Sequence, residues 1–127
     1  FLVKHLRINW TEGEKHFRNC LLDFNKANNV AQWQWVAGCG ADAAPYFRIF
    51  NPILQGEKFD KEGLYVKRWV PELNKVPSKF IHKPWEMELK YQETINTLIG
   101  KDYPKPIVIH EEARASALNA FQSLKKN

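Results

Sequence analysis

Trp33 and Trp35 stand one residue apart in the stretch NVAQWQWVAG (residues 29–38), whose composition predicts a helix. Indole is suited to two kinds of chemistry. Its π system is readily oxidised for an amino acid, and its flat face stacks on nucleic-acid bases. Because successive helical residues are turned by about 100°, Trp33 and Trp35 must point to nearly opposite sides of their helix. The plainer alternative is that both are core residues between two packed layers, where a tryptophan is usually found.

Asn29 and Trp10 are the next residues whose types and positions suit a site. Asn29 precedes Trp33 by four residues, one helical turn away on the same face. Its carboxamide both donates and accepts hydrogen bonds, so it could serve a polar ligand; the alternative is a helix cap. Trp10 stands just before a helix start, and from its position alone a packing role is favoured.

Helices joined by long connections are expected to position these residues. Thr11 and Glu14 form a capping box, and Gly38 is a natural C-cap for the helix that carries Trp33. Pro52 and Asp60 are expected at the starts of two short helices. The helices that we predict from apolar spacing cover residues 12–22, the stretch 29–38, a short helix from Pro52, another between Asp60 and Pro71 with Leu64, Tyr65 and Trp69 on one face, residues 85–98, and a last helix from His110.

The segments between these helices are polar or rich in Gly and Pro. Residues 23–29 read as a connector, residues 38–50 (with Pro45) as an ordered irregular loop, and residues 71–84 as mostly extended or turned. Residues 107–109 could pass for a strand, but one short run without a partner makes no sheet. The sequence therefore predicts an all-α protein with long ordered loops. The last helix is expected to bury a stripe formed by Ala113, Ala117, Phe121 and Leu124, with Lys125 and Lys126 at its negative end.

Length and composition set wider limits. A chain of 127 residues suits one domain with one core. The net charge of +5 suits a polyanionic partner such as nucleic acid, and nothing approaches the 18 or so consecutive apolar residues of a membrane span. Cys20 and Cys39 are too few for a disulfide framework and indicate free thiols in a reducing, intracellular compartment. The four histidines lack metal-site spacing, so we expect no metal.

The start of the chain suggests that more sequence precedes it. The first residue is Phe1 rather than a methionine. The opening residues FLVKHL are apolar and helix-like, yet no N-cap comes before them. We therefore expect the chain to be a fragment of a longer protein.

Five motifs, in order along the chain, resemble the C-terminal half of the flavin domain of class I DNA photolyases, which belong to the photolyase/cryptochrome family. They are FLVKHLRINWTEGEKHF (1–17), WQWVAGCGADAAPYFRIFNPILQGEKFD (33–60), YVKRWVPEL (65–73), IHKPWE (81–86) and YPKPIVIHEEAR (103–114). The resemblance covers essentially the whole chain. It implies the C-terminal part of a helical FAD-binding domain, with the first half of that domain and the antenna domain lying upstream, so the antenna pigment stays unknown.

The resemblance also implies an activity for the intact protein. Members of the family are deoxyribodipyrimidine photolyases, which split cyclobutane pyrimidine dimers in DNA with blue light and an electron from reduced FAD. The damaged nucleotides leave the base stack to reach the flavin. Because FAD is gripped by both halves of the domain, we expect this chain alone to bind it poorly and to be inactive. We also expect an exposed apolar face through which the chain could self-associate.

On the cofactor side, the resemblance implies roles for five residues. Trp33 matches the tryptophan nearest the flavin and Trp10 the middle member of an electron-transfer chain. Asn29 matches the residue beside flavin N5, where it favours the reduced forms. Asp23 matches an aspartate near the isoalloxazine ring whose arginine partner lies upstream, so here it should be solvated or protonated. Asn25 stands where the family usually has a second aspartate; as a flavin contact its side-chain carbonyl could still accept a hydrogen bond from the ring, but without the effect of a charge.

On the substrate side, Trp35 matches a residue that packs against the flipped dimer. Arg48, Gln55 and Lys58 fall on the lesion-facing side of the matching motif. Arg48 and Lys58 could hold phosphates that flank the dimer, although a solvated surface charge is the alternative for Lys58. One helix would then separate two tasks, with Trp33 facing the cofactor and Trp35 facing the lesion.

Two other functions stay open. A cryptochrome-type blue-light receptor would bind the same flavin without repair, but plant cryptochromes typically have Asp where this chain has Asn29, which favours repair. A helical module with weak nonspecific DNA binding and no cofactor is the second, and it describes the isolated chain best.

Overall fold

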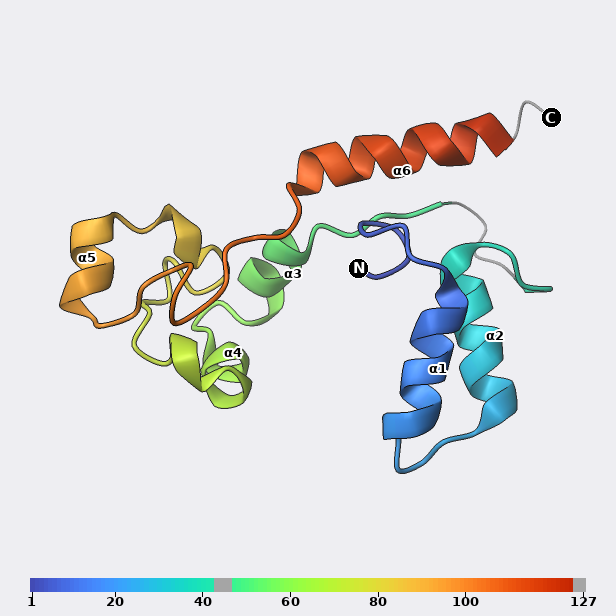
Figure 1. Cartoon of the computed structure of the whole chain (residues 1–127), viewed down its shortest axis with the longest axis horizontal. Helices are drawn as coiled ribbons and strands as arrows, with labels where there is room; N and C mark the ends of the chain where they lie inside the picture. The colour runs from blue at the N-terminus through green and yellow to red at the C-terminus, as the bar shows by residue number, and fades with distance from the viewer. Residues whose placement is uncertain (43–46, 125–127) are drawn as a thin grey trace. The chain divides into compact units, whose positions relative to one another are not determined.

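The computed structural model describes residues 1–42 and 47–124. These residues form helices and turns and contain no strand, which confirms the all-α prediction; their only ladder contact is an isolated bridge between Ile99 and Tyr103. The chain divides into two compact units, drawn in Figure 1. Unit 1 contains the described residues up to Ile49 and from Val108 onward, and unit 2 is Phe50–Ile107.

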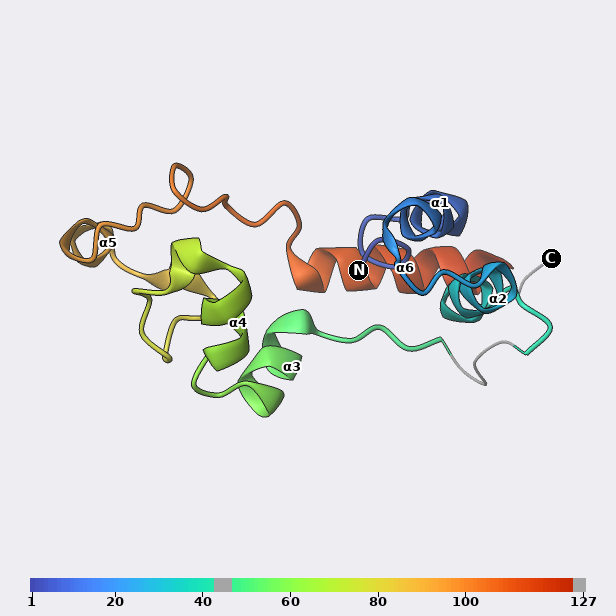
Figure 2. The same ribbon diagram turned by 90° about the horizontal axis from the view of Figure 1, so that it is seen from below.

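Unit 1 is built on a helical hairpin. Helix α1 (Trp10–Cys20) and helix α2 (Lys26–Ala37) are joined by a short connector and run in opposite directions, side by side in both Figure 1 and Figure 2. The third helix of the unit, α6, is His110–Leu124. This hairpin carries most of the residues that the sequence singles out.

The caps of the hairpin differ from the prediction. Asn9 caps α1, since its Oδ1 accepts from the backbone nitrogen of Thr11 at 3.0 Å. The predicted capping box of Thr11 and Glu14 is therefore wrong, and α1 begins at Trp10 and ends before residue 22. Asparagine caps better than threonine, and the helix therefore starts two residues earlier than predicted. Asn25 caps α2 in the same way, so α2 begins inside the expected connector. The prediction for Gly38 is confirmed, with a left-handed φ of 76° at the C-cap.

Helix α6 contacts the N-terminal turns of unit 1 and the segment that carries Phe47. His5 Nε2 lies 2.9 Å from His110 Nδ1, and Arg7 donates to the hydroxyl of Ser116 at 3.2 Å. The buried stripe predicted for this helix is confirmed at Ala117 and wrong at Leu124, which is 74% exposed at the end of α6. Lys125, Lys126 and Pro45, for which the sequence also suggested places, lie outside the described residues.

Unit 2 contains three short α-helices, α3 (Pro52–Phe59), α4 (Leu64–Trp69) and α5 (Leu89–Thr94), together with 3₁₀ turns at Pro71–Leu73 and Pro84–Glu86. The helix predicted over residues 85–98 is thus reduced to α5. The helix does not start earlier because residues 84–86 form a 3₁₀ turn. It does not continue toward residue 98 because Asn96 takes a left-handed φ of 51° and reverses the chain.

The core of unit 2 comes largely from the segment 71–84, which was expected to be mostly extended or turned. Leu73, Val76, Ile81 and Met87 are each less than 5% exposed and form one cluster. Turns between the prolines fold these side chains onto one another. Burying each of them contributes roughly 1.5–3 kcal/mol relative to leaving it in water.

Side chains at the starts of α3 and α4 satisfy their first backbone N–H groups. Asn51 Oδ1 accepts from Ile53 at 3.0 Å, and Pro52 occupies the first turn as predicted. The Asp60 carboxylate accepts from the backbone nitrogens of Tyr65 and Val66, which confirms its predicted capping role although Gly63 is the N-cap by position. Burial raises the pKa of Asp60, but these backbone N–H groups and His82 lower it by more, so its pKa lies below the ordinary value.

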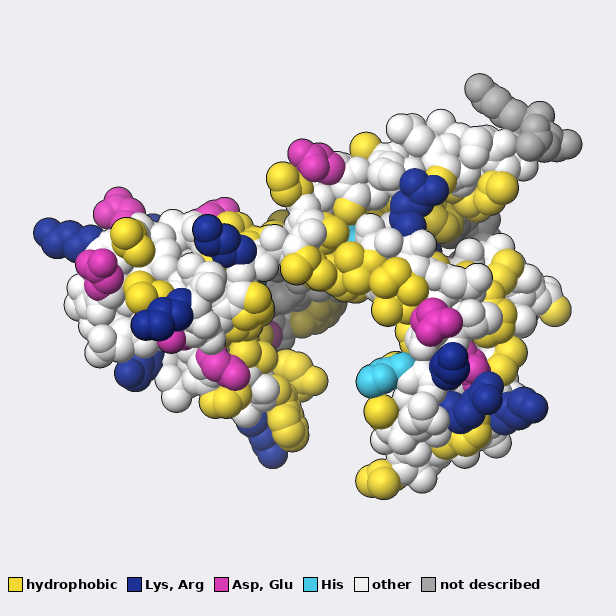
Figure 3. Space-filling view, viewed as in Figure 1, with side chains coloured by type: hydrophobic (Ala, Val, Ile, Leu, Met, Phe, Trp, Pro, Cys, Tyr) yellow, Lys and Arg dark blue, Asp and Glu magenta, His cyan; other side chains and the backbone are white. Residues whose placement is uncertain are grey.

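Apolar side chains lie in the open on α4. Leu64, Tyr65 and Trp69 are 71%, 69% and 61% exposed, so the face that they were predicted to share is turned to solvent. Figure 3 shows hydrophobic side chains exposed around this helix. Within the described residues, no helix combines the length and apolar character needed to cross a bilayer.

Candidate functional site in the α1–α2 hairpin

Trp33 is held against α1 by a glycine and a phenylalanine. A Cβ placed on Gly13 would overlap the six-membered ring of Trp33, so the indole lies directly on the backbone of α1. Phe17, one turn further along α1, meets Trp33 edge to face with ring centroids 5.1 Å apart and an interplanar angle of 74°. A glycine inside a helix costs roughly 1 kcal/mol relative to alanine. In return, Gly13 lets the Trp33 indole approach the backbone of α1 closely.

Asn29 is buried on the same side of α2 as Trp33, at 7% exposure. Its Nδ2 donates to the backbone oxygen of Glu14 at 2.9 Å and to Glu14 Oε1 at 3.3 Å. A backbone carbonyl can only accept, so the amide must turn its nitrogen to α1. Among the described residues nothing donates to Asn29 Oδ1, and this oxygen is therefore the atom left to accept from a ligand.

Glu14 is itself fixed by Arg18, one turn along α1. The Arg18 guanidinium reaches the carboxylate with Nη2–Oε distances of 2.7 and 2.8 Å, and Glu14 is 5% exposed. A buried carboxylate needs such a partner. The chain Arg18–Glu14–Asn29 thus sets the rotamer of the buried amide.

Trp35 faces the opposite way from Trp33. It is 36% exposed, whereas Trp33 is half-buried against α1. The prediction that the two indoles point to opposite sides of one helix is confirmed. An exposed indole on a rigid helix offers a face on which a base could stack.

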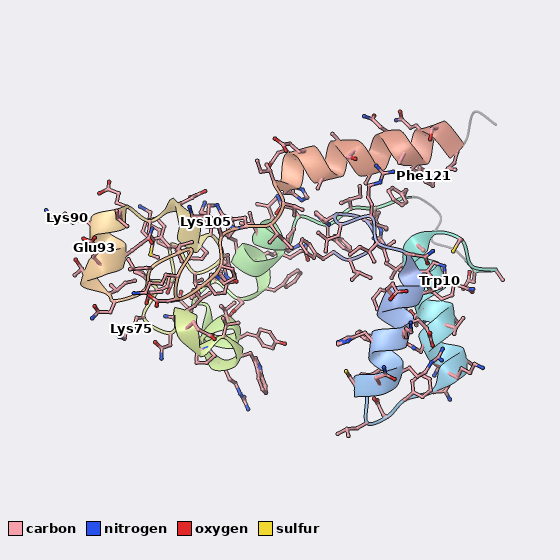
Figure 4. All side chains as sticks on the ribbon, in the orientation of Figure 1. Trp10, Lys75, Lys90, Glu93, Lys105 and Phe121 are labelled. Carbon is pink, nitrogen blue, oxygen red and sulfur yellow. The ribbon has the colours of Figure 1, made fainter. Side chains whose placement is uncertain are left out.

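Trp10 is the first residue of α1 and is half-buried. Figure 4 labels it at the start of the helix. Its spacing of three and seven residues from Gly13 and Phe17 places it on the face of α1 that meets α2. The hairpin therefore carries Trp10, Asn29 and Trp33 along one helix–helix contact.

Asp23 and Asn25 lie in and at the end of the connector between α1 and α2. Asp23 is exposed, in line with the expectation that it is solvated. Asn25 Oδ1 accepts from the backbone nitrogen of Asn28 at 3.0 Å and caps α2. One lone pair of this oxygen is thus engaged, and a second stays for another donor.

Arg48 lies on an extended segment of unit 1. Its side chain is exposed, and its backbone oxygen accepts from Lys4 Nζ at 2.5 Å. The neighbouring ring of Phe47 stacks on Phe121 of α6, with centroids 4.4 Å apart and planes inclined by 9°. Figure 4 labels Phe121 on the side of α6 that faces this segment.

Gln55 and Lys58 belong to unit 2, where both are exposed on α3. Their spacing of three residues puts them on one face of that helix. On another face, Gly56 packs against the His82 ring, whose Nε2 lies 2.7 Å from the backbone oxygen of Asp60. This contact fixes the corner between α3 and α4 that presents the two side chains.

Sequence reasoning missed the contributions of Gly13, Glu14 and Arg18. Two signals were present: a glycine inside an amphipathic helix, and an acid and a base four residues apart. The acid was instead assigned to a capping box. In the part of the chain that the structure describes, no cluster of three metal-ligating side chains occurs, and Cys20 and Cys39 are exposed free thiols.

Comparison with known proteins extends this picture. A photo-lyase of Agrobacterium fabrum, described as a deoxyribodipyrimidine photo-lyase, is 57% identical over 126 residues, which are 99% of this chain and 26% of the relative. A crystal structure from Agrobacterium tumefaciens, described as a bacterial class III photolyase, superposes with a TM-score of 0.92 at 57% identity, covering 100% of this chain and 26% of that one. A Synechocystis cryptochrome superposes with a TM-score of 0.87 at 35% identity, covering 94% and 24%.

The chain therefore spans about a quarter of the length of these relatives. The family described as the FAD binding domain of DNA photolyase matches residues 1–123. That match takes in the helical hairpin with its buried Asn29 and Trp33, Arg48 on its extended segment, and all of unit 2. The chain belongs to the family of FAD-binding domains of DNA photolyases.

Proposed function

We propose that the chain is the C-terminal half of the FAD-binding domain of a class I photolyase, which repairs cyclobutane pyrimidine dimers in DNA. Units 1 and 2 would then be parts of one domain. The observation that carries the proposal is the buried amide of Asn29, locked by Glu14 on the same side of α2 as Trp33, while Trp35 faces the other way.

The residues present fit one side of a flavin. Bound and reduced, FAD supplies the electron that splits the dimer when it absorbs light. Asn29 has its nitrogen engaged by Glu14, so its Oδ1 accepts from an N–H group and favours a protonated N5 of the flavin. Asp23 and Asn25 are the further candidates for contacts with the ring, and the second lone pair of Asn25 is the atom we assign to it.

Trp33 and Trp10 are proposed to carry electrons toward the cofactor. Both lie along the α1–α2 contact, and Gly13 and Phe17 keep water from part of the Trp33 ring. Packed side chains rearrange less than water does when the indole beside them loses an electron. This suits a residue that must be oxidised and restored repeatedly.

Damaged DNA is the proposed substrate. Trp35 offers an exposed indole to an extruded base at roughly 1–3 kcal/mol of stacking. Arg48, Gln55 and Lys58 are assigned to the flanking backbone, where contacts with phosphate give affinity without sequence preference. An intracellular location with DNA follows from this substrate and is part of the proposal.

We assign the chain to class I photolyases. The alternative is class III, because the similar Agrobacterium tumefaciens structure is described as a class III photolyase. A cryptochrome-type receptor without repair competes with the activity itself. The Synechocystis cryptochrome has the same fold but is less identical in sequence, at 35%.

A segment exchange tests the proposed function. The 126 matching residues of the Agrobacterium fabrum photo-lyase would be replaced by this chain, and light-dependent repair of an oligonucleotide with one cyclobutane dimer would be measured. We expect repair to survive, and Trp35→Ala to weaken binding of the damaged oligonucleotide. Lys15→Gln, an exposed change on α1, serves as the matched control.

Three results would separate the alternatives. A chimera that retains FAD and repairs nothing would indicate a receptor. A chimera that loses FAD would show that Asn29 and its neighbours do not fit the cofactor. The 127-residue chain by itself should be colourless after incubation with FAD and desalting, and tight stoichiometric flavin in that sample would contradict our view that both halves of the domain are needed.

A further inference from the structure

Lys4 lies beside Arg48 in unit 1. Its Nζ donates to the backbone oxygen of Arg48 at 2.5 Å and sits 4.6 Å from the centroid of the Phe47 ring. Burial lowers the pKa of Lys4, and the positive charge of Arg48 lowers it further. Lys4 and Arg48, from distant parts of the sequence, are thus tied together by this hydrogen bond.

The backbone that carries these cations is firmly positioned. The Phe47 ring contacts both the Phe121 ring, at a centroid distance of 4.4 Å, and the Lys4 ammonium group. The segment that carries Lys4 is tied to α6 by the pair His5–His110 at 2.9 Å. These contacts hold Lys4 and the backbone next to Arg48 against α6.

The partners of Lys4 do not neutralise its charge. A carbonyl oxygen and an aromatic face attract an ammonium group but carry no net negative charge. Within the described residues, no carboxylate forms an ion pair with Lys4. Holding like charges together costs folding free energy, and such an arrangement is typical of a surface that binds an anion.

We propose that Lys4 and Arg48 each bind a backbone phosphate of DNA, with Lys4 as a phosphate contact in its own right. The proposal rests on the proposed function, from which the assignment of Arg48 to DNA is taken. It adds Lys4 to the residues proposed to contact DNA. The competing explanation is that Lys4 only positions the backbone of Arg48.

The test measures binding of the chain to a fluorescein-labelled, undamaged duplex by anisotropy at several salt concentrations. Each phosphate contact contributes about 0.9 to the slope of log affinity against log salt, or about 3.5-fold between 50 and 200 mM salt. We expect Lys4→Gln and Arg48→Gln each to reduce the slope by about 1, and the double variant to reduce it by about 2. Lys4→Arg should keep the wild-type slope, and Lys15→Gln should leave it nearly unchanged.

A double variant with the same slope as Arg48→Gln alone would overturn the proposal, because Lys4 would then act only through Arg48. A wild-type slope in Lys4→Gln, or no detectable binding by the wild-type chain at low salt, would overturn it as well. Circular dichroism of each variant shows whether the helices are kept, and Lys4→Arg provides a charged variant if Lys4→Gln unfolds. The proposed function is judged separately, by preference for the dimer-containing duplex, so either idea can fail without the other.

Discussion

The side-chain amide nitrogen of Asn29 donates to the backbone oxygen of Glu14 at 2.9 Å, across the contact between α1 and α2. This one bond orients the amide, because the carbonyl of Glu14 offers only lone pairs. It ties the fold of the hairpin to the site, since the oxygen left over is the atom that a flavin would meet. Changes at Asn29 should therefore affect stability before any cofactor is present.

Asn29→Asp should destabilise the hairpin at neutral pH. An ionised aspartate cannot donate to the Glu14 oxygen and faces the Glu14 carboxylate, so we expect a loss of about 1–3 kcal/mol or more. The same surroundings raise the pKa of the new carboxyl above its unfolded value of about 3.9. Because the folded state then binds the proton more tightly, stability relative to wild type should recover as pH falls through the raised pKa.

Urea denaturation at several pH values measures this effect. Asn28→Asp is the matched control, since Asn28 is exposed on the first turn of α2, where a negative charge is favourable. Equal losses at the two positions, or a loss at Asn29 that does not depend on pH, would show that the hydrogen bond to Glu14 matters little.

Gly13→Ala should destabilise unit 1 although alanine is the better helix former. The gain in helix propensity is about 1 kcal/mol, but the new methyl group would overlap the Trp33 ring. Overpacking typically costs about 1–3 kcal/mol, so a net loss is expected, together with a change in the near-ultraviolet circular dichroism of Trp33. Ala27→Gly, on the exposed face of α2, reports the propensity term alone. A Gly13→Ala variant more stable than wild type would mean that the indole moves aside freely.

The stability of unit 1 should fall on mild acidification because of His5. Burial lowers its pKa, and the amino group of Phe1 and then His110 lower it further. The unfolded chain binds the proton more tightly, with a pKa of about 6.5. The contribution is therefore fully present above that pH and is lost as pH falls below it toward the lowered pKa of the folded state.

His5→Gln should flatten this pH dependence, as measured by the urea midpoint between neutral and mildly acidic pH. His16→Gln, at an exposed position on α1, should keep the wild-type profile. If the profile persists in His5→Gln and disappears in His16→Gln, a different histidine is responsible.

Leu73→Ala should cost about 2–5 kcal/mol, the usual range for removing a buried leucine side chain. Leu73 is 2% exposed in the core of unit 2, whereas Leu89 is 64% exposed. Leu89→Ala should therefore change the free energy of unfolding by no more than about 0.5 kcal/mol. Thermal or urea unfolding of the two variants checks the difference, and similar losses would place the core elsewhere.

The local part of this structure could be predicted from the sequence. Gly38 at a C-cap and Pro52 in a first turn depend on backbone conformations that each residue favours by itself. The opposite directions of Trp33 and Trp35 follow from helix geometry alone. The neighbours of Trp33 could not be predicted from the sequence, because Gly13 and Phe17 contact it only once α1 and α2 pack together.

The misses have a common physical origin. Glu14 has the spacing of a capping residue, yet its carboxylate is buried and bonded to Arg18 and Asn29. The contact with Asn29 joins two helices, so the sequence of α1 alone does not predict it. Residues 71–84 lack helical or alternating periodicity, so nothing marked them as a core. Their buried side chains are brought together by turns, each of which depends on the others.

The core of unit 2 bears on how the chain folds. Its four buried side chains lie within residues 73–87, so the loops that must close to assemble it are very short. Closing a short loop costs little chain entropy, and contacts close in sequence go with fast folding. On the ribosome, this core could collapse soon after Met87 leaves the exit tunnel, while α6 is still being made.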